Sequence, residues 1–108
     1  MSNILAHSVY FWLKEDLTAA EHATFVAGVK SLLTTPGVVF GHVGVPAPTD
    51  RPVIDRSYNY NLVLMFDSQQ SQDTYQDNDP NHQRFIDTCK TFWSKVLVVR
   101  VIVLVGIL

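Results

Sequence analysis

Two segments of this chain carry apolar or aromatic side chains on both faces of a predicted strand, which constrains the fold more than any other feature. In residues 5–13, side chains alternate between two faces, and both faces are largely apolar or aromatic. Residues 96–108 consist mostly of valine, isoleucine and leucine, interrupted by Arg100. Such strands are typical of sheets that are covered on both faces. A chain of 108 residues must therefore cover two apolar faces of one sheet.

Helix and turn signals divide the rest of the sequence into elements. Thr18 and Glu21 form a capping box, which predicts a helix from Thr18 to about Leu33. Asp79 can cap a second helix, and Pro80 suits its first position because proline has no N–H to leave unpaired. The predicted order is strand 5–13, helix 18–33, strand 38–45, loop 46–57, strand 58–66, a polar helix-compatible segment 67–78, a helix from Asp79 with apolar spacing through Trp93, and a last strand from about Val96.

This order of strand, helix, strand, strand, helix, strand predicts an α+β fold with ferredoxin-like βαββαβ topology in a single domain, 1–108. A sheet of this kind carries helices on one face only. The other face of the first and last strands is also apolar, and leaving it in water would expose a larger patch than monomers tolerate. The sequence therefore predicts a homodimer through this sheet face, a dimeric α/β barrel that buries roughly 800 Å² per copy.

Composition argues against several partners. The 8 Lys and Arg residues do not exceed the 10 Asp and Glu residues, so nucleic acid is not expected. The apolar C-terminal segment is shorter than the about 20 residues of a spanning helix and contains Arg100, so no membrane partner is expected. The first 13 residues lack the basic start and cleavage site of a secretory signal. With Cys89 as the single cysteine, the sequence predicts a cytoplasmic protein.

Cofactor and metal motifs are missing from the sequence. There is no Gly-rich phosphate loop, no Gly-x-Ser-x-Gly elbow and no Cys-x-x-Cys pair. The four histidines, His7, His22, His42 and His82, do not have the spacing of a metal site. We therefore expect neither a cofactor nor a metal.

His82 and Tyr75 are the candidate catalytic residues. His82 shares a helical stripe with Phe85 and Cys89, so it should face the sheet, where a neutral imidazole can accept a proton. Tyr75 precedes it by two helical turns, and a phenol there could polarise a carbonyl. Both also have a structural interpretation. His82 could bond a backbone carbonyl at the helix start, and Tyr75 could be the apolar anchor of a polar segment.

Three further polar residues occur in the predicted strands. His7 is enclosed if it shares a face with Val9 and Phe11. Asn61 lies in an apolar strand, where it either pairs with a neighbouring group or lines a cavity. Arg100 either meets a carboxylate of a second copy, binds an anionic ligand, or extends its charge into water.

The segment Tyr75–Phe85, Tyr-x(4)-Pro-x-His-x-x-Phe, and the opening His7-Ser-Val-Tyr-Phe-Trp resemble the stress-responsive A/B barrel (Dabb) domain family over about residues 5–102. The resemblance implies a dimeric α+β barrel. The family includes olivetolic acid cyclase, a plant polyketide cyclase that works without metal or cofactor. The resemblance implies catalytic roles for Tyr75 and His82 and a ligand-binding role for His7. Another histidine of that cyclase corresponds to Asn61, and an asparagine cannot take up a proton.

We therefore expect a homodimer that binds a small apolar or aromatic ligand between sheet and helices. His82 would act as base and Tyr75 as hydrogen-bond donor in cofactor-free, cyclase-like chemistry, while His7 and Asn61 would orient the ligand. One alternative is a non-catalytic, stress-related binding or structural dimer. Another is a cofactor-independent monooxygenase of the related dimeric barrels, which would use Asn61, His82 and Trp93 or Trp12.

Overall fold

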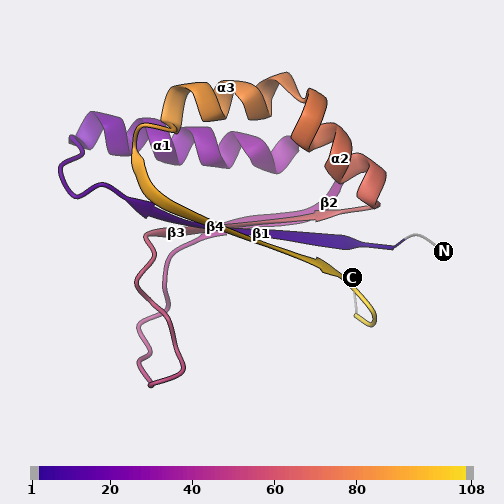
Figure 1. Cartoon of the computed structure of the whole chain (residues 1–108), viewed down its shortest axis with the longest axis horizontal. Helices are drawn as coiled ribbons and strands as arrows, with labels where there is room; N and C mark the ends of the chain where they lie inside the picture. The colour runs from indigo at the N-terminus through magenta and orange to yellow at the C-terminus, as the bar shows by residue number, and fades with distance from the viewer. Residues whose placement is uncertain (1–2, 107–108) are drawn as a thin grey trace.

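Four antiparallel strands form one sheet, and three helices pack on one of its faces (Figure 1). The structure is a computed structural model that describes residues 3–106. The elements are β1 (Leu5–Leu13), α1 (Ala19–Ser31), a 3₁₀ turn η1 (Leu32–Thr34), β2 (Val38–Gly44), β3 (Tyr60–Phe66), α2 (Gln69–Asn78), α3 (Pro80–Cys89) and β4 (Trp93–Ile102). The strand order is β2-β3-β1-β4, so the predicted ferredoxin-like α+β fold is confirmed.

Most element boundaries follow the local signals within two residues, and the largest differences from the prediction are at the end of α3 and the start of β4. The capping box of Thr18 and Glu21 is present at the start of α1. The polar segment forms helix α2, which Ser68 caps by accepting from Ser71 N. Helix α3 ends at Cys89 and β4 begins at Trp93, so the predicted helical spacing through Trp93 and the strand start at Val96 are wrong. The predicted last strand ends at Ile102, and residues 107–108 lie outside the described part.

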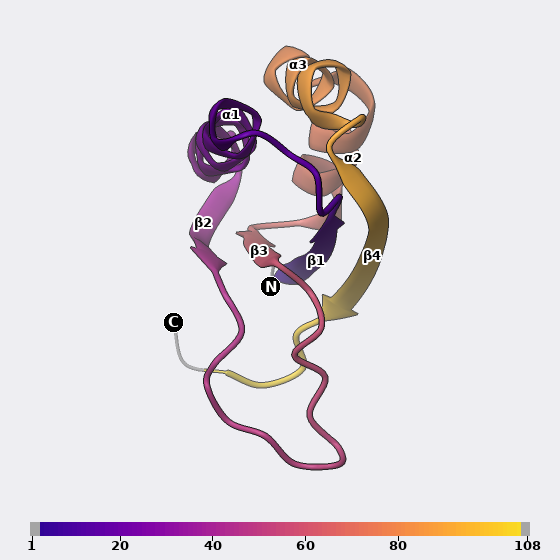
Figure 2. The ribbon, with the colours of Figure 1, turned by 90° about the vertical axis from the view of Figure 1, so that its left-hand side faces the viewer.

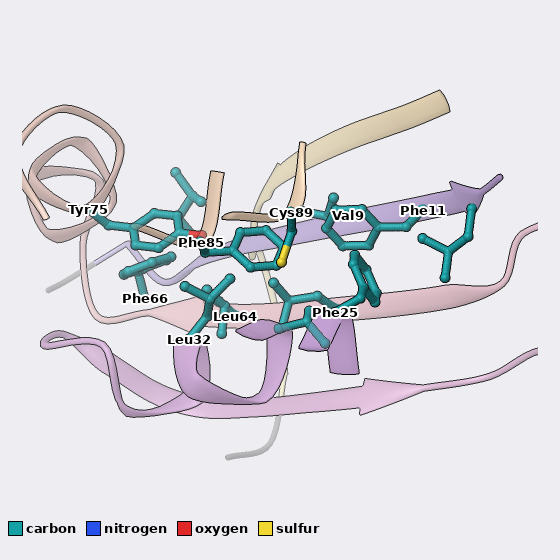
Figure 3. Packing of buried hydrophobic residues seen from close by; sticks show 13 residues of the cluster. Val9, Phe11, Phe25, Leu32, Leu64, Phe66, Tyr75, Phe85 and Cys89 are labelled. Carbon is teal, nitrogen blue, oxygen red and sulfur yellow. The ribbon is translucent and has the colours of Figure 1, made fainter. Parts of the chain in front are cut away.

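The core lies between the sheet and the helices (Figure 3). Alternate residues of β1 and β3 supply one side of it, and residues at helical spacing in α1, α2 and α3, together with η1, supply the other. Each fully buried large apolar side chain contributes roughly 1.5–3 kcal/mol to folding. The fully buried side chains are Phe25, Val29, Leu32, Leu62, Leu64, Phe66 and Cys89.

Among residues 3–106, no helix covers the second face of the sheet (Figure 2). In β4 the outward-facing Leu97, Val99 and Val101 are exposed, and they pair in register with Tyr10, Ser8 and Ala6 of β1. The loop of residues 45–59 extends away from the helices, past this uncovered face (Figures 1 and 2). The predicted apolar second face is therefore present.

On the face that the helices cover, the edge of the sheet at β4 is also partly exposed. Val96 and Val98 point to the helix side, opposite Phe11 and Val9 of β1, yet Val98 is 44% exposed. This edge is where the candidate site lies. No helix within residues 3–106 is long and apolar enough to span a bilayer.

Candidate functional site

A break between two short helices brings Tyr75 and His82 together. Asp79 ends α2 and caps α3, because its carboxylate accepts from Asn81 N at 2.8 Å and from His82 N at 3.1 Å. Pro80 occupies the first turn of α3, where no N–H is needed. The rings of Tyr75 and His82 are then in contact, with their centroids 4.1 Å apart and their planes tilted by 39°. Local capping therefore positions both candidate catalytic residues.

His7 approaches the same point from the sheet. It is the third residue of β1, is 4% exposed, and contacts Tyr75 edge to face with ring centroids 5.8 Å apart. Burial lowers the pKa of His7 from 6.5 to about 4, and the nearby charges of Arg100 and His82 act in the same direction. His7 is therefore neutral at pH 7.

Arg100 contacts two elements of the site. It is the register partner of His7, and its Nε donates to His7 Nδ1 at 3.2 Å. Its Nη2 donates to Gln76 Oε1 of α2 at 2.9 Å. Because arginine can only donate, His7 Nδ1 must be the acceptor, and the proton of the neutral imidazole is on Nε2. Arg100 therefore fixes the tautomer of His7.

Burial also determines the protonation of the other two groups. It raises the pKa of the Tyr75 hydroxyl, and the negative charge of Asp79 adds to this shift while Arg100 opposes it. Burial lowers the pKa of His82, against the opposing effects of Asp79 and of the Tyr75 backbone. At neutral pH the site therefore contains two neutral imidazoles, a protonated phenol and the positive charge of Arg100.

These groups line one cavity of about 180 Å³ between the sheet and helices α2 and α3. This is below the about 300 Å³ at which pockets for drug-sized ligands begin. It exceeds the roughly 150 Å³ of an apolar cavity that accepts benzene. The polar lining is His7, Tyr75, Gln76, His82 and Arg100, and the apolar lining is Val9, Phe11, Leu32, Leu62, Phe85, Ile86, Trp93, Val96 and Val98.

Asn61 lies on the opposite face of the sheet and does not line this cavity. It pairs with Tyr10, and its Nδ2 donates to Val9 O at 3.2 Å. The expectation that Asn61 joins the histidines is therefore corrected. The reason is strand alternation, which puts Asn61 on the face of Val63 and away from Leu62 and Leu64.

The remaining histidines lie apart from the site. His22 of α1 hydrogen-bonds the Tyr60 hydroxyl beside a broad surface hollow of about 880 Å³ that is open to solvent. Lys14, Glu15 and Asp16 line that hollow. The three residues with shifted pKa values in the candidate site, His7, Tyr75 and His82, do not line it. His42 is exposed on β2. Within residues 3–106 no three His, Cys, Asp or Glu side chains are grouped to hold a metal ion.

The sequence predicted His7, Tyr75 and His82 as site residues. It left the role of Arg100 open. His7 and Arg100 become neighbours only through the pairing of β1 with β4. The sequence did contain one relevant signal, since Arg100 is the single charge among the valines of a predicted buried strand. A buried-strand charge normally needs a partner, and His7 is the polar residue at the corresponding place in the first strand.

Several solved structures share this architecture. A Dabb family protein with a ferredoxin-like fold from Mesorhizobium loti is 25% identical, with 95% of this chain and 99% of that chain covered and a TM-score of 0.74. A dimeric ferredoxin-like protein of unknown function from Thermobifida fusca is 15% identical, with 95% and 93% covered and a TM-score of 0.75. The hydroxynitrile lyase of Passiflora edulis is 18% identical, with 95% of each chain covered and a TM-score of 0.76.

A search of the curated proteins finds no match. The family model of the stress responsive A/B barrel domain matches residues 5–103, which include every strand and helix described above. The resemblance of the Tyr75–Phe85 segment and of the opening strand is thus confirmed over nearly the whole length. The chain belongs to the stress responsive A/B barrel domain (Dabb) family.

Proposed function

We propose that this protein binds a small apolar or aromatic ligand in the cavity of His7, Tyr75 and His82 and acts on it by acid–base chemistry. One observation carries the proposal. Three ionisable side chains from β1, α2 and α3 converge on a cavity whose remaining wall is mostly apolar. Convergent polar groups in an apolar pocket are typical of ligand sites.

The protonation states support a division of roles. His82 has a lowered pKa, so its free base is available to accept a proton at neutral pH. Tyr75 has a raised pKa, so it keeps its proton and can donate to a carbonyl or an enolate oxygen. His7 carries its proton on Nε2 and is neutral, which suits it to orient a ligand by a hydrogen bond. Acid–base catalysis of this kind contributes about 10²–10⁴-fold.

The cavity volume limits the ligand. About 180 Å³ accommodates one aromatic ring with few substituents. We therefore propose a substrate near the size of a simple phenol or aromatic carbonyl compound. A long polyketide chain would exceed this volume and would have to extend past the partly open β4 edge.

We also propose that the protein acts as a homodimer through the uncovered sheet face. The exposed Leu97, Val99 and Val101 give this face a continuous apolar stripe along β4. Structures of the same fold are described as dimeric, which supports self-association here. Cys89 is buried and is the single cysteine, which fits a reducing, cytoplasmic location.

Ligand-induced thermal stabilisation tests the binding proposal. A panel of small phenols, aromatic aldehydes and keto acids should contain compounds that raise the melting temperature of the wild-type protein, since stabilisation grows with RT ln(1 + [L]/Kd). Replacing His82→Ala should abolish turnover of any compound that reacts, and Tyr75→Phe should lower it by about 10²-fold or more. His42→Ala and Tyr58→Phe make the same replacements outside the cavity and should retain activity. Full activity in both cavity variants would refute the catalytic proposal.

A non-catalytic binding protein is the second candidate, and the small cavity favours it. In that case the compounds would stabilise the protein without being converted. The structure does not favour the monooxygenase alternative, because that activity would use Asn61, which lies on the other face of the sheet.

Sedimentation tests the dimer. The wild-type protein should sediment as two copies of the 12.2 kDa chain at low micromolar concentration. Val99→Lys should shift it to the single chain or make it insoluble, because a charge would be buried in the interface. Ala20→Lys, on an exposed position of α1, is the matched control. A stable wild-type single chain would contradict the dimer.

A further inference from the structure

The Arg100 side chain makes hydrogen bonds that an arginine pointing into solvent would not make. An arginine in an apolar strand normally extends its guanidinium into water. Here the guanidinium turns toward the helix layer, where it bonds both the buried His7 and Gln76 of α2. It thereby lines the cavity together with Tyr75 and His82.

The guanidinium also has capacity for another partner. Arginine has five N–H donors, and the two hydrogen bonds to His7 and Gln76 use two of them. Both partners are uncharged at neutral pH, since burial keeps His7 neutral. No carboxylate within residues 3–106 forms an ion pair with Arg100. Asp79, the carboxylate that acts on the pKa values of Tyr75 and His82, already accepts two backbone N–H groups of α3.

We propose that the ligand is a small organic anion whose carboxylate pairs with Arg100 while its apolar part occupies the cavity. This rests on the proposed ligand-binding function and names the class of ligand. The distribution of the lining supports it, because Arg100 and Gln76 stand together while Phe85, Ile86 and Trp93 provide apolar surface. An arginine fork matches a carboxylate in geometry as well as in charge. A cationic ligand would be repelled there.

Matched pairs of acids and amides test this proposal, because each pair has the same shape and differs in charge. The probes are benzoate with benzamide, phenylacetate with phenylacetamide, and hexanoate with hexanamide, each titrated by calorimetry or by NMR shifts. The wild-type protein should bind at least one acid about fivefold to tenfold more tightly than its amide, since the guanidinium is partly solvated. The preference should decrease as salt is raised.

Variants assign the preference to Arg100. Arg100→Met should remove it, while Arg100→Lys should keep part of it because the charge remains. Arg84→Met is the matched control, since Arg84 is exposed on α3 and bonds Asn81 outside the cavity. The salt dependence of the wild-type preference is independent of whether the Met variant folds.

The outcomes separate the two proposals. Equal affinity of the wild-type protein for every acid and its amide would overturn the anion proposal and leave ligand binding intact. An acid preference that persists in folded Arg100→Met would also overturn it. Binding of none of the probes would overturn both proposals.

Discussion

Folding stability should decrease in mild acid because of one buried histidine. His7 is 4% exposed, and its pKa in the folded protein is about 4, against 6.5 ordinarily. The unfolded chain therefore takes up a proton as the pH falls below 6.5, whereas folded His7 resists protonation until about pH 4. Proton uptake by the unfolded state favours unfolding, so the contribution is full above pH 6.5 and lost on acidification.

The size of the effect follows from the two pKa values. They differ by about 2.5, and each pH unit corresponds to about 1.4 kcal/mol, so the full loss approaches roughly 3 kcal/mol. Between about pH 7.5 and about pH 4.5 most of it should be visible, about 2.5 kcal/mol. Such a loss is a large fraction of the stability of a small domain.

The assay compares wild-type protein with His7→Gln by denaturant unfolding at both pH values and at one fixed protein concentration, since self-association would couple to unfolding. Glutamine can still accept from Arg100 Nε, so the variant removes the titration and keeps an acceptor. His82 is present in both proteins, but its charge acts on His7, so the two groups titrate as a coupled pair in the wild-type protein. The difference between the two pH-dependent losses therefore reports the titration of His7 together with its coupling to His82.

His42→Gln is the control, because it makes the same replacement on the exposed strand β2 and leaves His7 in place. This variant should lose as much stability as the wild-type protein on acidification. If wild-type protein and His7→Gln lost equal stability, His7 would not be buried as a neutral imidazole, and the electrostatic account of the site would be wrong.

Three further replacements test the local structure through the free energy of unfolding. Thr18→Ala removes the capping box and should cost about 1 kcal/mol. Gly37→Ala should cost about 1–3 kcal/mol, because Gly37 has a φ of 89° and a Cβ there would meet Ser71 at 2.5 Å, whereas Gly44→Ala, where the nearest atom is 3.9 Å away, should cost clearly less. Gln72→Met should be neutral or stabilising, because Gln72 Nε2 is buried without a hydrogen-bond partner among the described residues.

Local signals predicted much of the fold, and non-local pairing explains the errors. The bounds of β1 and the caps at Thr18 and Asp79 depend on neighbouring residues and could be predicted. The end of α3 could not be predicted in this way. Apolar spacing continues through Trp93, but Phe92 O accepts from Lys14 N at the far end of β1, so the sheet takes up this segment. Tertiary pairing here outweighs helical periodicity.

The site was predictable to the extent that it lies within one stretch of chain. Tyr75 and His82 are seven residues apart, which in a continuous helix would separate them by roughly 10 Å along the axis. The break at Asp79, which the sequence signals by its cap and by Pro80, brings their rings into contact instead. The contact of His7 with Arg100 depends on the register of β1 and β4, which the turn after α3 and an irregularity at Trp12 and Leu13 determine. The alternation in residues 58–66 already indicated that Asn61 faces away from Leu62 and Leu64.

The central position of β1 has a consequence for synthesis on the ribosome. Its neighbours in the sheet are β3 and β4, and the contact of His7 with Arg100 spans 93 residues of chain. The strand of this sheet that is synthesised first therefore has hydrogen-bond partners on both edges only after the last strand has been made. Nascent chains that do not yet include β4 expose the unpaired edge of β1, which is apolar. Chaperones bind surfaces of this kind, and aggregates form on them.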